Sequence, residues 1–207
     1  MIVQTTTKAA FTLVETLVAV SVLLLVVVGP LTITTRTTKS ATFASEQVIA
    51  HFLAQEGLEL AQKGRDEFLL AHYQAPTTVA NPWTRFTQSG WSWDTCSVSI
   101  NPGGCGLSLA ATGQVANPID CDAATNNCAI RRSTQPATDR VLYRHGTTNS
   151  VATPYTRVVQ FFDVGTGAGA RDPQIRVVST VTWRSGNLLA TQQVQLETYL
   201  FNVYDRD

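Results

Sequence analysis

The chain has no lysine after residue 73 and no excess of either charge. Residues 74–207 carry ten Arg, no Lys and nine Asp or Glu, and the whole chain has fifteen basic and fifteen acidic side chains. Such a surface has no broad positive field to attract a phosphate backbone. The composition therefore predicts no specific nucleic-acid partner.

The chain also lacks the motifs of an active site or a metal centre. Its histidines, His51, His72 and His145, are scattered and have no nucleophile motif, phosphate loop or ligand cluster beside them. Asp120-Cys121-Asp122 and Asn126-Asn127 offer oxygens, but without the spacing and closing Glu of a calcium loop. We expect surface histidines and a solvated turn. The sequence predicts no enzyme activity, no cofactor and no metal.

Cysteine is absent from the apolar N-terminal part of the chain. An even number of cysteines behind such a segment favours export and disulfide formation. Three pairings are possible, and we favour the pairing of sequence neighbours, which closes two short loops rich in Gly and Asn. The alternative is four free thiols, and the absence of C-x-x-C spacing argues against zinc. The four residues are Cys96, Cys105, Cys121 and Cys128.

The longest uncharged segment runs from residue 16 to residue 35, between Glu15 and Arg36. At about 1.5 Å per helical residue, it covers roughly 30 Å, the thickness of the hydrocarbon core of a bilayer. A carboxylate at the edge of such a helix costs a few kcal/mol if it goes deep. We therefore expect Glu15 to have a partner.

The N-terminal segment has three interpretations. The uncharged stretch is longer than that of a secretory signal, and no small-residue cleavage site follows closely. An uncleaved signal anchor explains the span but gives Glu15 no role. A cut between Ala10 and Phe11 would create an amine one helical turn from Glu15, where the helix dipole also favours a carboxylate. In a bundle of staggered helices, the carboxylate of one chain can then meet the amine of another.

Residues Lys8-Ala9-Ala10-Phe11-Thr12-Leu13-Val14-Glu15-Thr16-Leu17-Val18-Ala19-Val20 closely resemble the prepilin processing site of bacterial type IV pilins and pseudopilins. The resemblance implies a leader at residues 1–10, removed by a prepilin peptidase that then methylates the new amine of Phe11. It assigns Glu15 to inter-subunit pairing. The family usually has Gly where this chain has Ala10, and Ala is small enough that we expect processing.

The resemblance also implies where the protein acts and with what. Its partners would be membrane lipid before assembly, the prepilin peptidase, an inner-membrane assembly platform and other pilin subunits. The globular part would lie outside the cytoplasm, anchored by a single helix in the inner membrane. After assembly the chain would belong to an extracellular pilus or a periplasmic pseudopilus.

The N-terminal part of the chain predicts one long helix in two halves, at residues 11–35 and 36–73. Gly29-Pro30 interrupts the first half, and we expect there either a kink or a point where the helix can bend or melt. Helical periodicity returns at Ala41, and the helix is expected to end near Tyr73. Its apolar side is expected to hold Ala41, Ala44, Val48, Ile49, Phe52 and Leu53.

Residues 74–207 are predicted to form a globular antiparallel-sheet domain with disulfide loops. Short strands are expected at 96–100 and 107–110, and longer ones at 157–164, 174–184 and 188–203. Ser185-Gly186 predicts a two-residue turn that makes the last two strands a hairpin. The expected fold class is α+β, a long N-terminal helix packed on an antiparallel sheet, as in the pilin fold that the resemblance implies.

An aromatic cluster precedes the first cysteine. We expect Trp83, Trp91, Trp93 and Phe86 to fill the gap between helix and sheet, although exposed tryptophans would fit a sugar-binding adhesin. Arg131-Arg132 is expected to face solvent. The sequence as a whole predicts a structural subunit, a minor pilin of a type IV pilus. A pseudopilin of a type II secretion or competence system is the alternative, and a signal-anchored adhesin or extracytoplasmic enzyme is a third.

Overall fold

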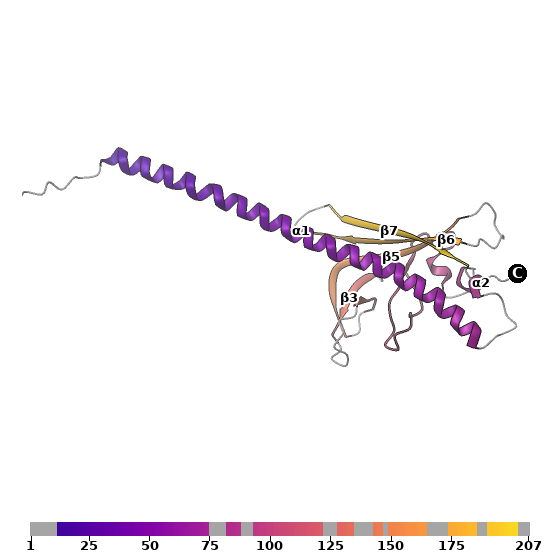
Figure 1. Ribbon diagram of the computed structural model, residues 1–207. Helices are drawn as coiled ribbons and strands as arrows, with labels where there is room; N and C mark the ends of the chain where they lie inside the picture. Colours follow the sequence, from indigo (N-terminus) through magenta and orange to yellow (C-terminus); the bar gives the residue numbers. More distant parts are fainter. Residues whose placement is uncertain are drawn as a thin grey trace, which may run out of the picture. The chain divides into compact units, whose positions relative to one another are not determined.

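The structure is a computed structural model that describes residues 12–74, 82–87, 93–121, 128–134, 143–146, 149–164, 174–185 and 190–202. The chain divides into two compact units, Met1–Ser45 and Glu46–Asp207. Helix α1, Leu13–Gln74, contributes residues to both units (Figure 1). Its last residue lies one position beyond Tyr73, so the expected end of the helix is confirmed.

The second unit has one antiparallel sheet of seven strands within the described residues. The path of neighbouring strands is β2-β1-β5-β3-β4, and β6 pairs with both β5 and β7. A long helix with an antiparallel sheet confirms the expected α+β class. The strands are β1 (Cys105–Gly106), β2 (Ile119–Asp120), β3 (Ala129–Ser133), β4 (Tyr143–Arg144), β5 (Ser150–Asp163), β6 (Gln174–Trp183) and β7 (Gln192–Phe201).

The C-terminal hairpin is confirmed as an antiparallel pair of β6 and β7, in register from Gln174↔Phe201 to Trp183↔Gln192. The turn expected at Ser185-Gly186 falls partly outside the described residues. Strand β7 begins at Gln192, four residues later than expected, and β5 begins at Ser150, seven residues earlier than expected. The alternation of β6 is confirmed because the inward residues Ile175, Val177, Ser179, Val181 and Trp183 are all buried.

The strand expected at residues 96–100 is wrong. The chain there forms the 3-10 helix η1 (Asp94–Cys96), followed by turns in which the amide of Asn101 donates to the carbonyl of Ser97 at 2.7 Å. Residues 107–110 contribute only an isolated bridge at Leu109, so the strand expected there is also wrong. Ser97 likewise makes only an isolated bridge, to Phe161 of β5. Local turn bonds and the Cys96–Cys105 disulfide hold these segments, and no extended sheet pairing forms there.

The side of α1 that packs on the sheet differs from the one expected. Of the residues assigned to the apolar side, only Leu53 is buried, whereas Val48, Ile49 and Phe52 are exposed. From Ala50 to Gly64 the buried residues lie one, three or four positions apart, as one helix face requires, and most are small. They are Ala50, Leu53, Ala54, Gly57, Leu60, Ala61, Gly64 and Leu69.

Aromatic side chains fill the space at the end of α1, as expected. Trp83 and Phe86 of α2 (Pro82–Thr87) are buried, as is Trp93. The ring centroids of Phe86 and Trp93 are 5.0 Å apart, and Trp93 stacks on Phe161 of β5 at 6.0 Å. Trp91 lies outside the described residues. Fully burying each such ring contributes about 1.5–3 kcal/mol, which makes this cluster a main part of the core.

The small face of α1 lets the helix approach the sheet and Trp93 closely. A Cβ atom on Gly64 would come nearer to the Trp93 indole than real contacts allow. Because Phe68, Phe86 and Phe161 surround this indole, it cannot move aside.

We therefore expect Gly64→Val to destabilise the second unit by about 1–3 kcal/mol. Urea unfolding of the full chain in detergent, followed by tryptophan fluorescence, measures this change. Gln62→Val, at an exposed position of the same helix, controls for the lower helix propensity of Val. Equal stability losses in the two variants would show that the close approach does not matter.

The four cysteines form Cys96–Cys105 and Cys121–Cys128, the pairing of sequence neighbours that the sequence favoured. The Nδ2 group of Asn101 lies 2.9 Å from the carbonyl of Thr95 and 2.6 Å from a carboxylate oxygen of Asp120. Asn101, inside the loop closed by Cys96–Cys105, thus contacts the residue that precedes Cys121. Two disulfides are typical of a domain in an oxidising, extracytoplasmic compartment.

Candidate functional site

The helix begins at a side-chain cap. The backbone amide of Glu15 lies 3.3 Å from the hydroxyl oxygen of Thr12 and 3.1 Å from its carbonyl, and the amide of Thr16 donates to the same carbonyl at 3.2 Å. Thr is a preferred N-cap because its hydroxyl accepts a bond from an otherwise unpaired amide. The cap fixes Glu15 in the first turn of α1. Ala10 and Phe11, the expected processing site, lie outside the described residues.

Glu15 carries the only charge among the described residues from 12 to 35. No cation in the described part of the chain lies within ion-pair distance of its carboxylate. The first-turn position favours a negative charge through the helix dipole, by about 0.3–1 kcal/mol.

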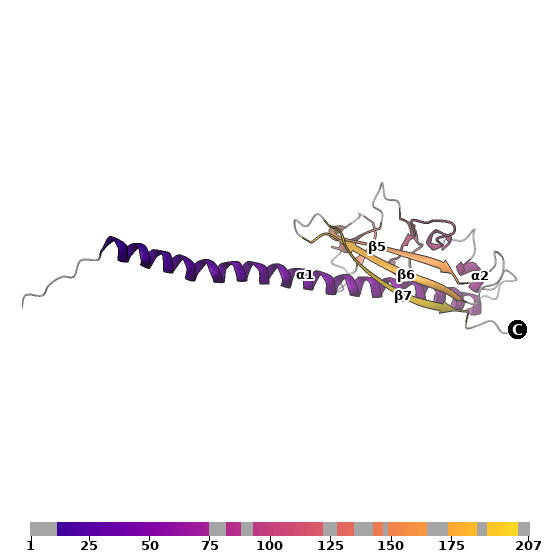
Figure 2. The ribbon, with the colours of Figure 1, turned by 90° about the horizontal axis from the view of Figure 1, so that it is seen from above.

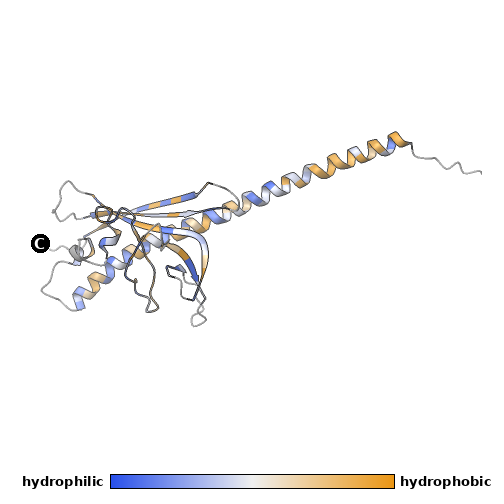
Figure 3. Ribbon diagram, turned by 180° about the vertical axis from the view of Figure 1, so that it is seen from behind, coloured by the Kyte–Doolittle hydropathy of each residue, from blue (hydrophilic) through white to orange (hydrophobic). Residues whose placement is uncertain are grey.

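The first part of α1 is apolar on every side. Its large side chains are exposed, from Leu13 at 79% to Val27 at 47%, and Figure 3 shows mostly hydrophobic colouring along this segment. By length and composition, α1 is the one helix of the described residues able to cross a membrane. A helix that is apolar all round requires lipid or other helices around it.

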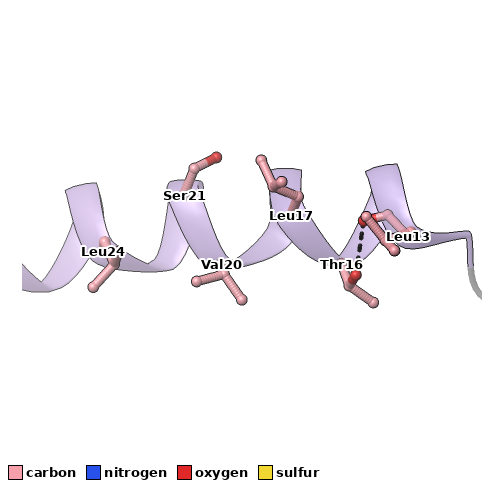
Figure 4. Close-up of a pocket in the computed structure, with 6 residues that line it drawn as sticks. All are labelled: Leu13, Thr16, Leu17, Val20, Ser21 and Leu24. Atoms are coloured by element: carbon pink, nitrogen blue, oxygen red, sulfur yellow. Dashed lines mark hydrogen bonds between the residues drawn. The ribbon is translucent and has the colours of Figure 1, made fainter.

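A shallow hollow runs along one side of this apolar segment (Figure 4). Four leucine and valine side chains repeat there at intervals of four, three and four residues, the spacing of a helix-packing seam. Two small hydroxyl residues complete its lining. The lining residues are Leu13, Thr16, Leu17, Val20, Ser21 and Leu24.

Gly29 and Pro30 lie inside the uninterrupted helix. Proline has no N–H, so the carbonyl of Val26 loses its helical donor. The kink and the weak point expected here remain predictions. Hydroxyl groups nearby donate to carbonyls of the preceding turn: Thr32 to Gly29 at 2.8 Å, and Thr34 to Pro30 at 2.8 Å.

In the second unit, the structure reveals a buried charge that the sequence analysis missed. Arg157 of β5 is 0% exposed, and its Nη1 atom lies 2.6 Å from Glu56 Oε2 on α1 and donates to the carbonyl of Leu53 at 3.0 Å. Its Nη2 atom donates to the carbonyl of Leu107 at 2.6 Å. Burial lowers the pKa of the guanidinium, and Glu56 opposes that effect. Arg157 therefore connects β5 to α1 and to the segment at Leu107, which follows Cys105.

His145 lies near the Arg157 guanidinium and is not the surface residue that was expected. Its Nδ1 atom is 3.3 Å from the carbonyl of Ala129, and its Nε2 atom is buried without a hydrogen-bond partner. Burial, and secondarily the charge of Arg157, lowers the pKa of His145 to about 4. His145 is thus neutral at physiological pH.

The lowered pKa of His145 predicts a dependence of stability on pH. An unfolded histidine titrates near pH 6.5 and this one near pH 4, so the unfolded chain binds more protons between those values. The contribution is complete above about pH 6.5 and is lost as the pH falls towards 4, by at most about 3 kcal/mol. Comparing urea unfolding at several pH values in the wild type and in His145→Gln measures it, and parallel curves would contradict the prediction.

The other candidate residues do not gather into a site. No group of three or more metal-ligating side chains occurs among the described residues. His51 is exposed, Arg132 faces solvent as expected, and Arg131 bonds to Ser150 Oγ at 2.9 Å. Trp93 is buried, so it does not supply the exposed ring of an adhesin.

No protein-family model, curated protein or solved structure matches this chain. The N-terminal segment is therefore the feature of this chain that indicates a function.

Proposed function

We propose that this chain is a pilin-like filament subunit, a minor pilin of a type IV pilus. The observation that carries the proposal is the junction of Ala10-Phe11 with a capped helix that bears Glu15 in its first turn and no further charge until Arg36. Its work is assembly rather than catalysis.

The physical basis is the exchange of lipid for protein around the first part of α1. The apolar surface of this segment is stable in a bilayer and equally stable inside a bundle of like helices. What distinguishes the two states is Glu15, whose carboxylate lacks a described partner in the isolated chain. Cleavage before Phe11 creates an ammonium group that can pair with Glu15 of a neighbouring subunit. That pair sets the axial register between subunits.

The two disulfides and the uncharged span support the arrangement of this subunit in the membrane. A single span at the N-terminus leaves the second unit on one side, and disulfides are stable outside the cytoplasm. After assembly, the second unit would lie on the surface of the filament.

The mass of the native N-terminus tests this proposal. We expect the chain from membranes and filaments to begin at Phe11 with one methyl group on its amine. Ala10→Gly should be processed at least as fully as the wild type, and Ala10→Leu should be blocked because the side chain is bulky. Intact Met1 on the membrane-resident protein, in cells that have the peptidase, would contradict the proposal.

A further inference from the structure

His145 packs its ring between three strands of the second unit. It directly follows β4, and its Nδ1 atom lies 3.3 Å from the carbonyl of Ala129 on β3. A Cβ atom on Gly106 of β1 would lie only 2.9 Å from the Cδ2 and Nε2 atoms of the ring, so the ring rests on the backbone of β1. The third neighbour is Arg157 of β5. His145 therefore attaches β4 to β1 as well as to β3.

The surroundings of the ring suit its neutral form. A carbonyl oxygen only accepts, so Nδ1 carries the proton and Nε2 is left as an acceptor, buried without a partner among the described residues. A proton on Nε2 would add a positive charge near the Arg157 guanidinium, which is 0% exposed. A buried charge needs a partner or hydration. Protonation therefore favours a ring that has left this position.

The elements packed around His145 bring it no free countercharge. Glu56 of α1 is already paired with Arg157 of β5, at 2.6 Å, and the carboxylate of β5, Asp163, lies at the far end of that strand. Strand β1 brings no titratable side chain, because Cys105 is in a disulfide. Burial, and secondarily the charge of Arg157, keep the pKa of His145 at about 4. The charged or titratable residues of β3 and β4 are Arg131, Arg132, Tyr143 and Arg144.

Strand β4 is an easily detached part of the sheet. It has two residues, whereas β5 has fourteen and β6 and β7 have ten each. Figure 2 shows these three long strands side by side. Segments with few backbone bonds open at a lower free-energy cost than the whole unit. Release of His145 can thus free residues 143–146 while the long strands stay paired.

We propose that His145 is a pH-sensitive latch: the neutral ring holds residues 143–146 against β1, and protonation releases them. A released histidine titrates near pH 6.5 and the held ring near pH 4. The released form therefore binds more protons between these values, and release becomes about tenfold more favourable for each unit that the pH falls. The full change is about 300-fold, and release no longer depends on pH above about 6.5 or below about 4. This latch goes beyond the pilin-like function and does not depend on it.

Hydrogen exchange of the full chain in detergent, followed by mass spectrometry, measures the release. Dividing the rates by those of unstructured peptides of the same sequence removes the intrinsic effect of pH on exchange. Between pH 6.5 and pH 4 we expect the protection of residues 143–146 to fall by up to about 300-fold. The protection of β6 and β7 should stay nearly constant over the same range.

Matched variants assign the effect to one side chain. In His145→Gln, which does not titrate in this range, the protection of residues 143–146 should no longer depend on pH. His51→Gln removes an exposed histidine of α1 and should behave as the wild type. Constant protection of residues 143–146 in the wild type, an equal fall in His145→Gln, or an equal fall in β6 and β7 would overturn the proposal.

An NMR titration of the labelled imidazoles provides a second test on the unmodified chain, which decides the question even where His145→Gln does not fold. We expect the His145 ring to titrate well below pH 6.5. A His145 ring that titrates at the value of an exposed histidine would overturn the latch. The N-terminal mass is independent of both measurements, so the latch and the proposed function can fail separately.

Discussion

Replacing Glu15 by alanine will leave the chain in the membrane and exclude most of it from filaments. The apolar residues that drive insertion are untouched, and removing an edge carboxylate makes insertion easier. In the bundle, the amine of a neighbouring subunit would be buried without a countercharge. Removing one partner of a buried pair costs about 3–5 kcal/mol, and each 1.4 kcal/mol is about a factor of ten. We expect at least a tenfold fall in incorporation.

Quantitative immunoblots of membranes and sheared filaments measure this effect. Glu15→Gln keeps the size of the side chain and removes its charge, so it should fail like Glu15→Ala. Thr37→Ala is the matched control, because the Thr37 hydroxyl donates to the carbonyl of Ile33 within its own helix at 3.0 Å and does not line the hollow. Normal incorporation of Glu15→Ala would remove the pairing role.

Replacing Glu56 by alanine will destabilise the second unit more than replacing its partner, Arg157, by methionine. Glu56→Ala leaves a guanidinium that is 0% exposed without its countercharge, at a cost of about 3–5 kcal/mol. Arg157→Met leaves a carboxylate that is 33% exposed and can be hydrated, with an apolar side chain in the vacated space. We expect this loss to be about 2 kcal/mol, from unpaired carbonyls and imperfect packing.

The Arg176–Glu197 pair on the sheet surface is the control for this asymmetry. It joins the same residue types at 3.1 Å, with side chains 34% and 50% exposed. Exposed pairs contribute about 0–1 kcal/mol, so Arg176→Met and Glu197→Ala should both have small effects. Urea unfolding of the four variants gives the comparison. Equal losses for Glu56→Ala and Arg157→Met would show that burial of the guanidinium does not decide the cost.

The long helix and the hairpin could be predicted because each repeats one simple pattern. The uncharged residues 16–35 leave only helix as a membrane-spanning structure, and the alternation of residues 174–183 is the period of a strand. The pairing of sequence-adjacent cysteines could be favoured over the other two pairings because it closes short loops. These features depend on neighbours in the sequence, which are visible without a structure.

The predicted apolar side of α1 was wrong because it followed hydropathy, which gave most weight to Val48, Ile49 and Phe52. Val48, Ile49 and Phe52 remain exposed, while Gly57 and Gly64 lie against Ser179 and Trp93. Close approach to a sheet selects small residues, and hydropathy does not measure size. The spacing of Ala50, Ala54, Gly57, Ala61 and Gly64 was the signal that could have identified this face.

Arg157 was also visible in the pattern. It occupies an inward position between Tyr155 and Val159 of β5, where an apolar residue is the rule. A charge at such a position requires a partner. What the sequence could not supply was the identity of that partner, since Glu56 lies on a different element and their meeting depends on the packing of α1. His145 was missed for the same reason.

The threonines of α1 bear on the passage from lipid to water. Six hydroxyls between residues 32 and 42 each donate to a carbonyl three or four residues earlier, at 2.8–3.0 Å. Because these hydroxyls and carbonyls bond to each other within α1, they need few hydrogen bonds from the surrounding medium. In the proposed membrane-anchored subunit, this stretch would cross a headgroup boundary with only a small change in solvation, so α1 could move along its axis and stay helical.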